Sequence, residues 1–487
     1  MTAKHSRGRD TVGRRQFVLV AIAVGLLFVG FAVRHWLELQ AGVVHRHIDN
    51  ALLINLCAFG WLLVTLTLAL SSRDVAPDAV RGRDWFLSTV MTLYNEDPAT
   101  FLAALRSLGG QSRLPDRVWI TDDGSATGDC EDVFRQWLAT ECPAGLDVRF
   151  TRQANTGKRG AQAAAFRQDL DADLIMTMDS DVILDPDAIL QGLAPFQSKR
   201  VMSVAGFLLG LNYETNLLTR IVDVGFIAAF LNGRAGLSRV GSVSVNAGGL
   251  AFYRARVVRD NLEHYLTQTV LGRHVQSGDD AMLTRYALLA GRCVFQRASV
   301  GYTLHPENMI HLSKQRLRWH RSFFWGNTWL LARFPMTRLI WWMTLWQFVD
   351  FAFMTILMPL ALVVVPLTSG RFGWAMLPFI VLLAYIQSAQ YLSVRRPDQS
   401  YRSQVALFLL APLGSFLNFY LGWALQYVGL ATVGKTGWST RQSVEVGLSA
   451  PAGSVDVRLD DLLAATVQLP VQRVHGPAET AELPAVH

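Results

Sequence analysis

The chain has 487 residues, of which 51% are hydrophobic and only 17% are charged, and its mean hydropathy of +0.25 is high for a soluble protein. This composition predicts a membrane protein that also has room for one large soluble domain. The net charge of +7 suits nucleic acid, anionic lipid or a phosphorylated substrate, but most basic residues flank apolar segments, so nucleic-acid binding is not expected. The four cysteines have no CxxC spacing, which argues against a zinc cluster or disulfide framework and favours free thiols in a reducing cytosol.

Two apolar runs near the N-terminus, residues 17–33 and 51–70, are long enough to cross a hydrocarbon core of about 30 Å as helices. A cleaved signal peptide is the alternative for the first run, because Arg14 and Arg15 precede it, but no small-residue cleavage site follows. Lys and Arg are denser before the first run than between the two runs, which places the N-terminus in the cytosol. We therefore predict a cytosolic N-terminus and two transmembrane helices in residues 1–72.

Residues 73–312 are predicted to form a cytosolic α/β domain. Apolar runs rich in strand-forming residues, at 86–93, 117–121 and 174–178, alternate with helical patterns such as residues 98–108. This alternation predicts βαβ units and a mostly parallel sheet with flanking helices. In such sheets, ligands bind beyond the carboxyl ends of the strands.

A polar cluster follows each of these three predicted strands. The clusters are Tyr94-Asn95-Glu96, Asp122-Asp123-Gly124-Ser125 and Asp179-Ser180-Asp181. One cluster could be a simple turn, but three at one sheet edge indicate a binding site for a nucleotide diphosphate sugar. Asp123 and Asp179 can accept hydrogen bonds from base and ribose, and the Tyr94 ring can stack on the base. Asp181 can hold Mg²⁺ or Mn²⁺ through oxygen, and Lys158 is either a phosphate ligand or a solvated loop charge.

Two later segments are predicted to be helices at the membrane surface. Residues 212–239 have apolar side chains at helical spacing, although ordinary core packing is equally compatible with this pattern. A helix over residues 314–321 would place Gln315, Arg318 and Trp319 at i, i+3 and i+4, on one face. Its basic and aromatic residues also suit a bilayer surface, so we expect residues 313–340 to serve both as part of the site and as an interfacial region.

Three apolar runs complete the predicted membrane region: residues 340–367, 374–394 and 405–433. They predict two or three more spans within residues 341–433, followed by a flexible tail at 434–487. Polar residues within these runs, Asp350, Asn418 and Gln426, must face protein or a water-filled path rather than lipid. These polar residues could therefore form helix–helix contacts or line a pore, and the sequence does not choose between the two roles.

Taken in chain order, these motifs resemble the family 2 processive glycosyltransferases, which include hyaluronan, chitin and cellulose synthases. The three clusters above are followed by Gly157-Lys158-Arg159-Gly160, Ser277-Gly278-Asp279-Asp280 and Gln315-Arg316-Leu317-Arg318-Trp319. Singly these motifs are weak signals, but the ordered set is a strong one. The resemblance implies a GT-A-type domain inserted between transmembrane helices.

The resemblance also implies roles for individual residues. It makes Tyr94, Asp123, Lys158 and Asp179 contacts of UDP, Asp181 the ligand of Mg²⁺ or Mn²⁺, Asp280 the general base, and Gln315, Arg318 and Trp319 the residues that close over the diphosphate and the acceptor sugar. Asp279 is expected to raise the pKa of the Asp280 carboxyl. The alternative is a purely structural role, in which these two aspartates only cap a helix that starts at Ala281.

The sequence is most similar to hyaluronan and chitooligosaccharide synthases, because Ser277-Gly278-Asp279-Asp280 replaces the Thr-Glu-Asp of cellulose synthases, and the paired N-terminal spans favour the hyaluronan branch. The late Gly437-Trp438-Ser439-Thr440-Arg441 resembles, with altered order, a Trp-Gly-Thr motif near a gating loop. Two departures leave the sugar open. Ala281 stands where hyaluronan synthases usually have Arg, and Ala247-Gly248-Gly249-Leu250 stands where they have Ser-Gly-Pro-Leu.

The predicted activity is processive, inverting transfer from a UDP-sugar to a growing β-linked polysaccharide, by a multi-pass protein of the plasma membrane that also moves its product across the bilayer. One base and a direct displacement predict the inversion. The expected partners are the UDP-sugar, the polysaccharide and the bilayer. Transfer of one sugar to a lipid carrier is the alternative, but it does not require Gln315, Arg318 and Trp319. A regulatory module with a degenerate domain would have lost catalytic carboxylates, and all are present.

Overall fold

The computed structural model describes residues 66–80, 83–359, 364, 367–368, 376–437 and 473–474. The predicted span at residues 17–33 lies outside the described residues, as do most of the span at 51–70, the end of the run at 340–367 and nearly all of the predicted tail. The three cysteines within the described residues are free thiols, as expected.

An eight-stranded mixed sheet, in the order β4-β3-β2-β5-β8-β7-β11-β6, forms the centre of the domain. Its strands are β2 (Leu87–Leu93), β3 (Arg117–Asp122), β4 (Asp147–Arg152), β5 (Leu174–Asp179), β6 (Ile183–Leu184), β7 (Val201–Gly210), β8 (Leu250–Arg254) and β11 (Arg292–Thr303). The first four strands in the sheet order are parallel, and β7 is parallel to β11. The remaining pairs, β5–β8, β7–β8 and β6–β11, are antiparallel.

The expectation of a mostly parallel sheet therefore holds for six of the eight strands, and the exceptions are β8 and β6. The reversal at β8 has a simple cause. Leu250, the first residue of β8, pairs with Met178, the penultimate residue of β5. The chain thus enters β8 at the edge of the sheet where β5 ends, without the crossover helix that a parallel connection needs.

Helices pack around this sheet as the sequence pattern predicts. The predicted helix at residues 98–108 is α3 (Pro98–Gly109), which starts with Pro98 and is capped by Asp97, whose carboxylate accepts a hydrogen bond from the Thr100 backbone at 3.0 Å. Another helix of the domain, α5 (Lys158–Gln168), packs against β2 and β3. The remaining elements of the domain are β1 (Asp74–Val75), which pairs with β12 (Arg473–Val474), η2 (Pro77–Val80), α4 (Asp129–Thr140), α6 (Ala188–Leu193), η3 (Ala194–Gln197), α9 (Ala255–Arg259), α10 (Leu262–Thr267), β9 (Thr269–Val270), β10 (Arg273–His274) and α11 (Asp279–Ala290).

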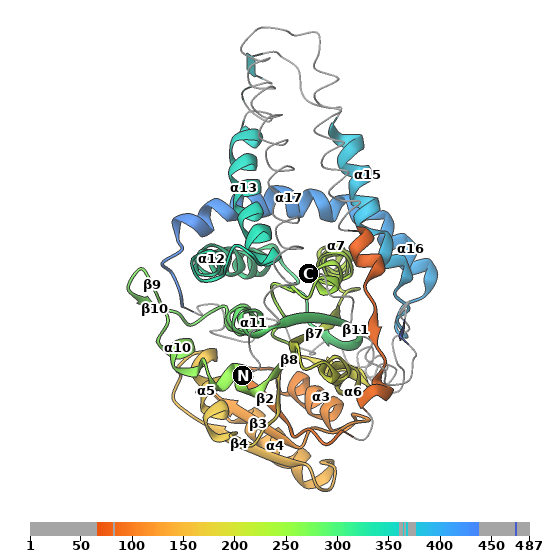
Figure 1. The fold of residues 1–487 in the computed structure, drawn as a ribbon. Coiled ribbons are helices and arrows are strands. Elements are labelled where there is room, and N and C mark those ends of the chain that lie inside the picture. The colour runs from red at the N-terminus through yellow and green to blue at the C-terminus, as the bar shows by residue number, and fades with distance from the viewer. Residues whose placement is uncertain are drawn as a thin grey trace.

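Long helices cover one side of the domain (Figure 1). They are α7 (Leu217–Ala228), which continues through the π-helical η4 (Ala229–Arg234) into α8 (Ala235–Arg239), α12 (Met309–Arg333), and α17 (Ala411–Ala431). In Figure 1, α17 lies across α12 and α7, whereas α13 (Leu339–Pro359) and α15 (Met376–Ser388) project away from the domain. The helix predicted at residues 212–239 is thus present, and it packs against the domain.

Within the described residues, Leu217–Arg239 is the one helix long and apolar enough to cross a membrane by itself, yet 61% of its most apolar part is buried inside the protein. That burial favours the core-packing alternative for this segment. The pair α16 (Tyr401–Leu409) and α17 meets the same criterion only when taken together, and the pair is bent by 44°. The predicted span at residues 405–433 is therefore broken, beside Pro412.

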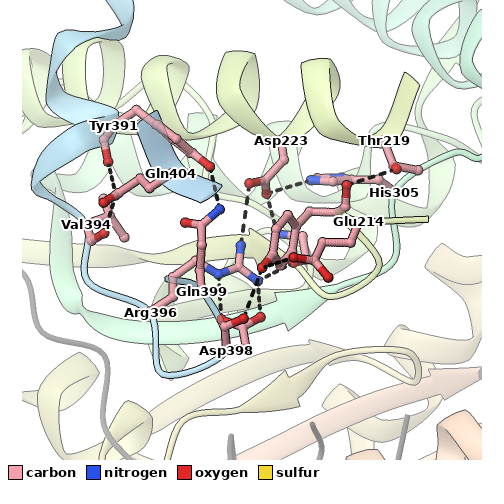
Figure 2. Close-up of polar contacts among 12 residues, drawn as sticks. Glu214, Thr219, Asp223, His305, Tyr391, Val394, Arg396, Asp398, Gln399 and Gln404 are labelled. Carbon is pink, nitrogen blue, oxygen red and sulfur yellow. Dashed lines mark hydrogen bonds and ion pairs between the residues drawn. The ribbon is translucent and has the colours of Figure 1, made fainter. Parts of the chain in front are cut away.

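A buried ion cluster joins the C-terminal helices to the end of β7 (Figure 2). We call Arg396, Asp398, Asp223 and His305 the Arg396 cluster. Arg396 follows η6 (Ala389–Ser393) and binds both Asp398 oxygens at 2.7 and 2.9 Å and Asp223 at 3.5 Å. The other Asp223 oxygen accepts a hydrogen bond from the Gly210 backbone at 2.9 Å and lies 3.2 Å from His305 Nε2. This cluster fixes the segment before α16 against α7 and the sheet.

Candidate active site

A cavity of about 860 Å³ opens at the carboxyl ends of β2, β3 and β5. The residues singled out from the sequence all line it: Tyr94, Asp123, Lys158, Asp179, Asp181, Asp280, Gln315, Arg318 and Trp319. Strand register explains part of this convergence, because Leu93 pairs with Asp122, and Thr92 pairs with Asp179. The polar clusters that follow these strands are therefore neighbours in space.

One end of the cavity has the features that a nucleotide needs. Tyr94 is partly exposed there, so a face of its ring is accessible for stacking. Asp123 is 3% exposed, and its Oδ1 accepts hydrogen bonds from Gln153 Nε2 and from the Thr156 backbone, both at 2.9 Å. The Oδ2 atom makes no hydrogen bond within the described residues and can accept one from a ligand.

Lys158 links the end of β5 to the start of α11. Its Nζ lies 2.7 Å from Asp179 Oδ1 and 3.1 Å from Asp279 Oδ2, and its side chain is only 14% exposed. Burial alone would lower the pKa of Lys158, but the two carboxylates outweigh burial and raise it. The alternative of a solvated loop charge is therefore wrong. Lys158 is a buried cation on the cavity wall.

Asp279 and Asp280 occupy the first turn of α11, so this helix starts two residues before the start considered from the sequence. Gly278 precedes them with φ of 67°, a left-handed conformation that favours glycine. Although burial opposes it, Lys158 lowers the pKa of Asp279. Burial and the charge of Asp279 raise the pKa of Asp280 to about 6. The expected effect of Asp279 on Asp280 is thus confirmed, and neighbouring carboxyls with diverging pKa values are typical of acid–base sites.

The helix α12 brings the last motif to the cavity. Gln315, Arg318 and Trp319 share one face of α12, as their spacing predicts, and all three line the cavity. Trp319 is 40% exposed, which leaves its ring accessible to a sugar. Arg316 lies elsewhere on the same helix, and its Nη2 donates to Asn418 Oδ1 of α17 at 3.3 Å. One helix therefore contacts both the site and the C-terminal helices.

Comparison with known proteins agrees with this geometry. The sequence profile described as glycosyl transferase family 2 matches residues 88–262. The chain is 31% identical to a hyaluronan synthase of Streptococcus pyogenes over 80% of its own length and 91% of that protein. This chain belongs to glycosyl transferase family 2. It is accordingly a hexosyltransferase.

Other similar proteins extend the comparison. N-acetylglucosaminyltransferases of Neorhizobium galegae and Mesorhizobium japonicum are 28% and 30% identical over 77% and 78% of this hexosyltransferase, and 84% and 88% of their own lengths. A solved structure of a Pyrobaculum calidifontis mannosyltransferase, in complex with GDP-Man and Mn²⁺, superposes with a TM-score of 0.50 at 17% identity, covering 76% of this chain and 97% of that one. That likeness supports the GT-A-like fold of the family 2 domain.

The donor atoms suit a divalent cation shared with a substrate. Within the described residues, no group of three or more His, Cys, Asp or Glu side chains could hold a metal ion. Asp179 and Asp181 nevertheless place carboxylate oxygens on the cavity wall. Mg²⁺ is commonly bound by one or two carboxylates and completed by phosphate oxygens and water. The residues of this hexosyltransferase therefore fit a cation that binds together with a nucleotide diphosphate.

A supporting layer beneath the site was missed by the sequence analysis. Arg159 is 1% exposed and donates to the Tyr265 carbonyl at 3.2 Å, to Gln268 Oε1 at 2.8 Å and to the Gly278 carbonyl at 3.1 Å. Gln162 Nε2 donates to Asp279 Oδ2 at 3.2 Å. These contacts hold the turn before α11. The Gly157-Lys158-Arg159-Gly160 motif pointed to this loop, but not to the inward direction of Arg159.

The segment after α17 returns to the site of the family 2 enzyme. The Gln276 backbone N–H donates to the Thr436 carbonyl at 3.2 Å, and the Thr436 hydroxyl donates to the His274 carbonyl at 2.6 Å. Gln276 also lines the active-site cavity. The motif at residues 437–441 thus begins beside the site, and its last four residues lie outside the described residues.

Proposed function

We propose that this family 2 hexosyltransferase is a membrane-embedded polysaccharide synthase that adds sugars from a UDP-sugar to a growing β-linked chain. The observation that carries the proposal is the position of Asp280. It has a pKa of about 6 and lines the same cavity as Asp181 and Trp319. The relatives named hyaluronan synthase and N-acetylglucosaminyltransferase support an amino sugar as one donor sugar.

The chemistry assigned to Asp280 is removal of a proton from the acceptor hydroxyl. The acceptor oxygen forms the new bond to the anomeric carbon as the bond from that carbon to the diphosphate oxygen breaks, and UDP leaves with the electron pair. Asp280 retains the proton until solvent removes it. A general base of this kind contributes about 10²–10⁴-fold in rate. Because the displacement is direct, an α-linked donor gives a β-linkage.

The donor would be held by residues at the other end of the cavity. Tyr94 stacks on the base, while Asp123 and Asp179 accept hydrogen bonds from base and ribose. Lys158 and Arg318 place positive charge near the diphosphate, and the planar guanidinium can bind phosphate through two hydrogen bonds. A bound Mg²⁺ or Mn²⁺, for which Asp181 is the assigned ligand, would supply Lewis-acid stabilisation of the leaving diphosphate.

A second cavity supports passage of the product toward the membrane helices. It has a volume of about 340 Å³ and is lined by Arg316, His320, Asp350, Asn418 and Gln426, together with apolar residues. The three polar residues noted in the predicted spans therefore meet at one cavity, which favours the pore-lining alternative. Arg316 and His320 also line the active-site cavity. A chain that leaves the site along α12 would enter this second cavity.

The test is polymer synthesis by the purified full-length protein in lipid nanodiscs, with Mn²⁺ and labelled UDP-N-acetylglucosamine, alone and with UDP-glucuronate. High-molecular-mass product that a β-specific hydrolase digests would support the proposal. Single-sugar products alone would contradict processive synthesis. For translocation, the protein is placed in inverted vesicles, and polymer that stays fully accessible to added hydrolase would contradict export.

A further inference from the structure

The active-site cavity extends past Asp280 to a group of polar side chains that the transfer chemistry does not use. We call it the arginine end, and it consists of Arg234, Arg285, Asn327 and Gln347. It lies away from the diphosphate contacts, because Lys158 binds Asp279 at the start of α11, whereas Arg285 is in the helix's second turn. Five residues separate Asp280 from Arg285, which is about 7–8 Å along a helix.

Arg285 is a buried cation with open hydrogen-bond donors. Its side chain is 3% exposed, and Nη2 donates to Asn327 Oδ1 at 3.1 Å. Within the described residues, Nε and Nη1 have no acceptor. Gly326 makes room for this guanidinium, since a Cβ there would lie 2.5 Å from Cζ. Gln347 accepts from Asn327 Nδ2 at 3.0 Å, so the amide that orients Arg285 is itself held in place.

Arg234 supplies a second cation to the wall of the same cavity. It lies in the π-helical turn η4, a type of irregularity often found at functional sites. Its Nε donates to the Val245 carbonyl at 3.0 Å, and its guanidinium lies 3.8 Å from the centre of the Phe230 ring. Within the described residues, its two Nη groups make no hydrogen bond, and neither Arg234 nor Arg285 forms an ion pair.

Both arginines remain protonated at neutral pH. Burial lowers the pKa of each to about 10, and the nearby charge of Asp280 partly offsets that effect. Arg285 is buried with open donors, which is unfavourable unless an anion or another acceptor reaches it, and Arg234 is partly exposed on the cavity wall. Guanidinium groups match the geometry of carboxylates and phosphates. Since the diphosphate is assigned to the Lys158 end, the anion expected here is a carboxylate on a sugar.

We infer that Arg234 and Arg285 form a subsite for the carboxylate of a uronosyl residue at the acceptor end of the growing chain. The inference rests on the proposed function and deepens it, because it names the class of sugar that the acceptor carries. The position of Arg285 assigns the subsite to the acceptor rather than to the donor sugar. Arg285 lies further along α11 than Asp280, the assigned base for the acceptor hydroxyl, whereas Lys158 binds Asp279 at the start of that helix. Ala281, one turn before Arg285, also lines the cavity and leaves space there.

The test compares Arg234→Gln and Arg285→Gln with the wild type, as full-length protein in nanodiscs. One sugar is transferred from UDP-N-acetylglucosamine to oligosaccharides that end in glucuronate or in a neutral sugar. We expect the ratio of kcat/KM for the glucuronate-ended acceptor to kcat/KM for the neutral acceptor to fall about 10–100-fold. Lysine at either position should recover part of the ratio. Arg135→Gln, which removes an exposed arginine of α4 paired with Glu131, should leave it unchanged.

Equal losses on both acceptors would mean that the arginines only support the fold, and would overturn the subsite. A change in KM for UDP-glucuronate without a change in the acceptor ratio would overturn the acceptor assignment. Calorimetric binding of the two oligosaccharides separates the subsite from turnover. A wild type that binds both oligosaccharides equally while it transfers sugar contradicts the subsite alone. A wild type that binds the glucuronate oligosaccharide through Arg234 and transfers no sugar contradicts the proposed function alone.

Discussion

Two buried clusters in this hexosyltransferase each combine a cation with aspartates, but one fixes the fold and the other lines the candidate active site. In the Arg396 cluster, the side chains of Arg396, Asp223 and Asp398 are fully buried, and the guanidinium binds both carboxylates. The two aspartates raise the pKa of Arg396 despite burial. At the candidate active site, Lys158 binds Asp179 and Asp279 beside a cavity of about 860 Å³, and burial and the charge of Asp279 raise the pKa of Asp280 although the Lys158 charge opposes this.

The difference shows how the pairing of buried charge separates structure from chemistry. Where each carboxylate has a cation, as around Arg396, the charges are fixed and the cluster joins two parts of the chain. Where one carboxylate is left over, burial and its neighbours shift its pKa toward neutrality, and it can exchange a proton with a substrate. Asp280 is that carboxylate. Four predictions test this contrast.

The largest effect is expected for Asp280→Asn. An amide cannot take the acceptor proton, so polymer formation should fall by about 10²–10⁴-fold. UDP binding, measured by calorimetry, should change little, because Asp280 is not among the residues assigned to hold the nucleotide. Asp132→Asn, on the exposed surface of α4, is the matched control. Wild-type turnover in Asp280→Asn would remove Asp280 as the base.

Next in size is the loss of Arg396. Arg396→Met leaves two buried carboxylates unpaired, so the free energy of unfolding should fall by about 3–5 kcal/mol. Thermal unfolding in detergent micelles measures this loss. Arg395→Met is the control, since that neighbouring side chain is exposed. Adding Asp223→Asn should recover part of the loss. A double variant that loses the full sum would show that the two residues do not interact.

Arg318→Ala should lower kcat by about 10²-fold, the size typical for one lost donor that stabilises developing negative charge. Its folded yield and membrane insertion should change far less. Arg333→Ala serves as a control on the same helix, because Arg333 is exposed and is not among the residues that line the cavity. An equal fall in folded protein and in turnover would favour a structural role for Arg318.

The smallest effect is a shift in pH dependence. Asp280 must be ionised to act as a base, so kcat should fall about tenfold per unit as the pH drops below the Asp280 pKa of about 6, and should level off above it. Because the charge of Asp279 raises the pKa of Asp280, Asp279→Asn should move this limb to lower pH. Single-turnover rates across pH provide the measurement. A limb that stays in place would show that another group titrates.

The local sequence pattern was sufficient to predict β2, β3, β5 and the helix α3, whose strands end at the cavity. The runs at residues 86–93, 117–121 and 174–178 match β2, β3 and β5 closely, because buried strands and their polar ends are encoded within a few residues. The reversal of β8 was not predictable, since it depends on where a loop re-enters the sheet. The break between α16 and α17 lies beside Pro412, a residue that marks a kink in the sequence but does not give its angle.

Residues that line the cavity were predictable where short motifs end strands or share a helix face, as with Asp181 and Arg318. The partners of buried cations were not. Arg159 and Arg285 look like surface charges in sequence, and only tertiary packing brings each to its partners, as when Arg159 reaches the carbonyl of Gly278. The local sequence does not show whether a charged side chain is buried, because its burial depends on segments far away along the chain.

The Arg396 cluster also has a consequence for how this enzyme can be divided. Asp223 belongs to the catalytic half of the chain, but its cation comes from a segment between the C-terminal helices. A fragment cut after α12 would keep that carboxylate and its contact with His305, but it would lose the Arg396 guanidinium. The catalytic domain therefore depends on the C-terminal segment for its stability. A shortened protein meant for crystallisation or for polymer synthesis needs Asp223 replaced by a neutral residue.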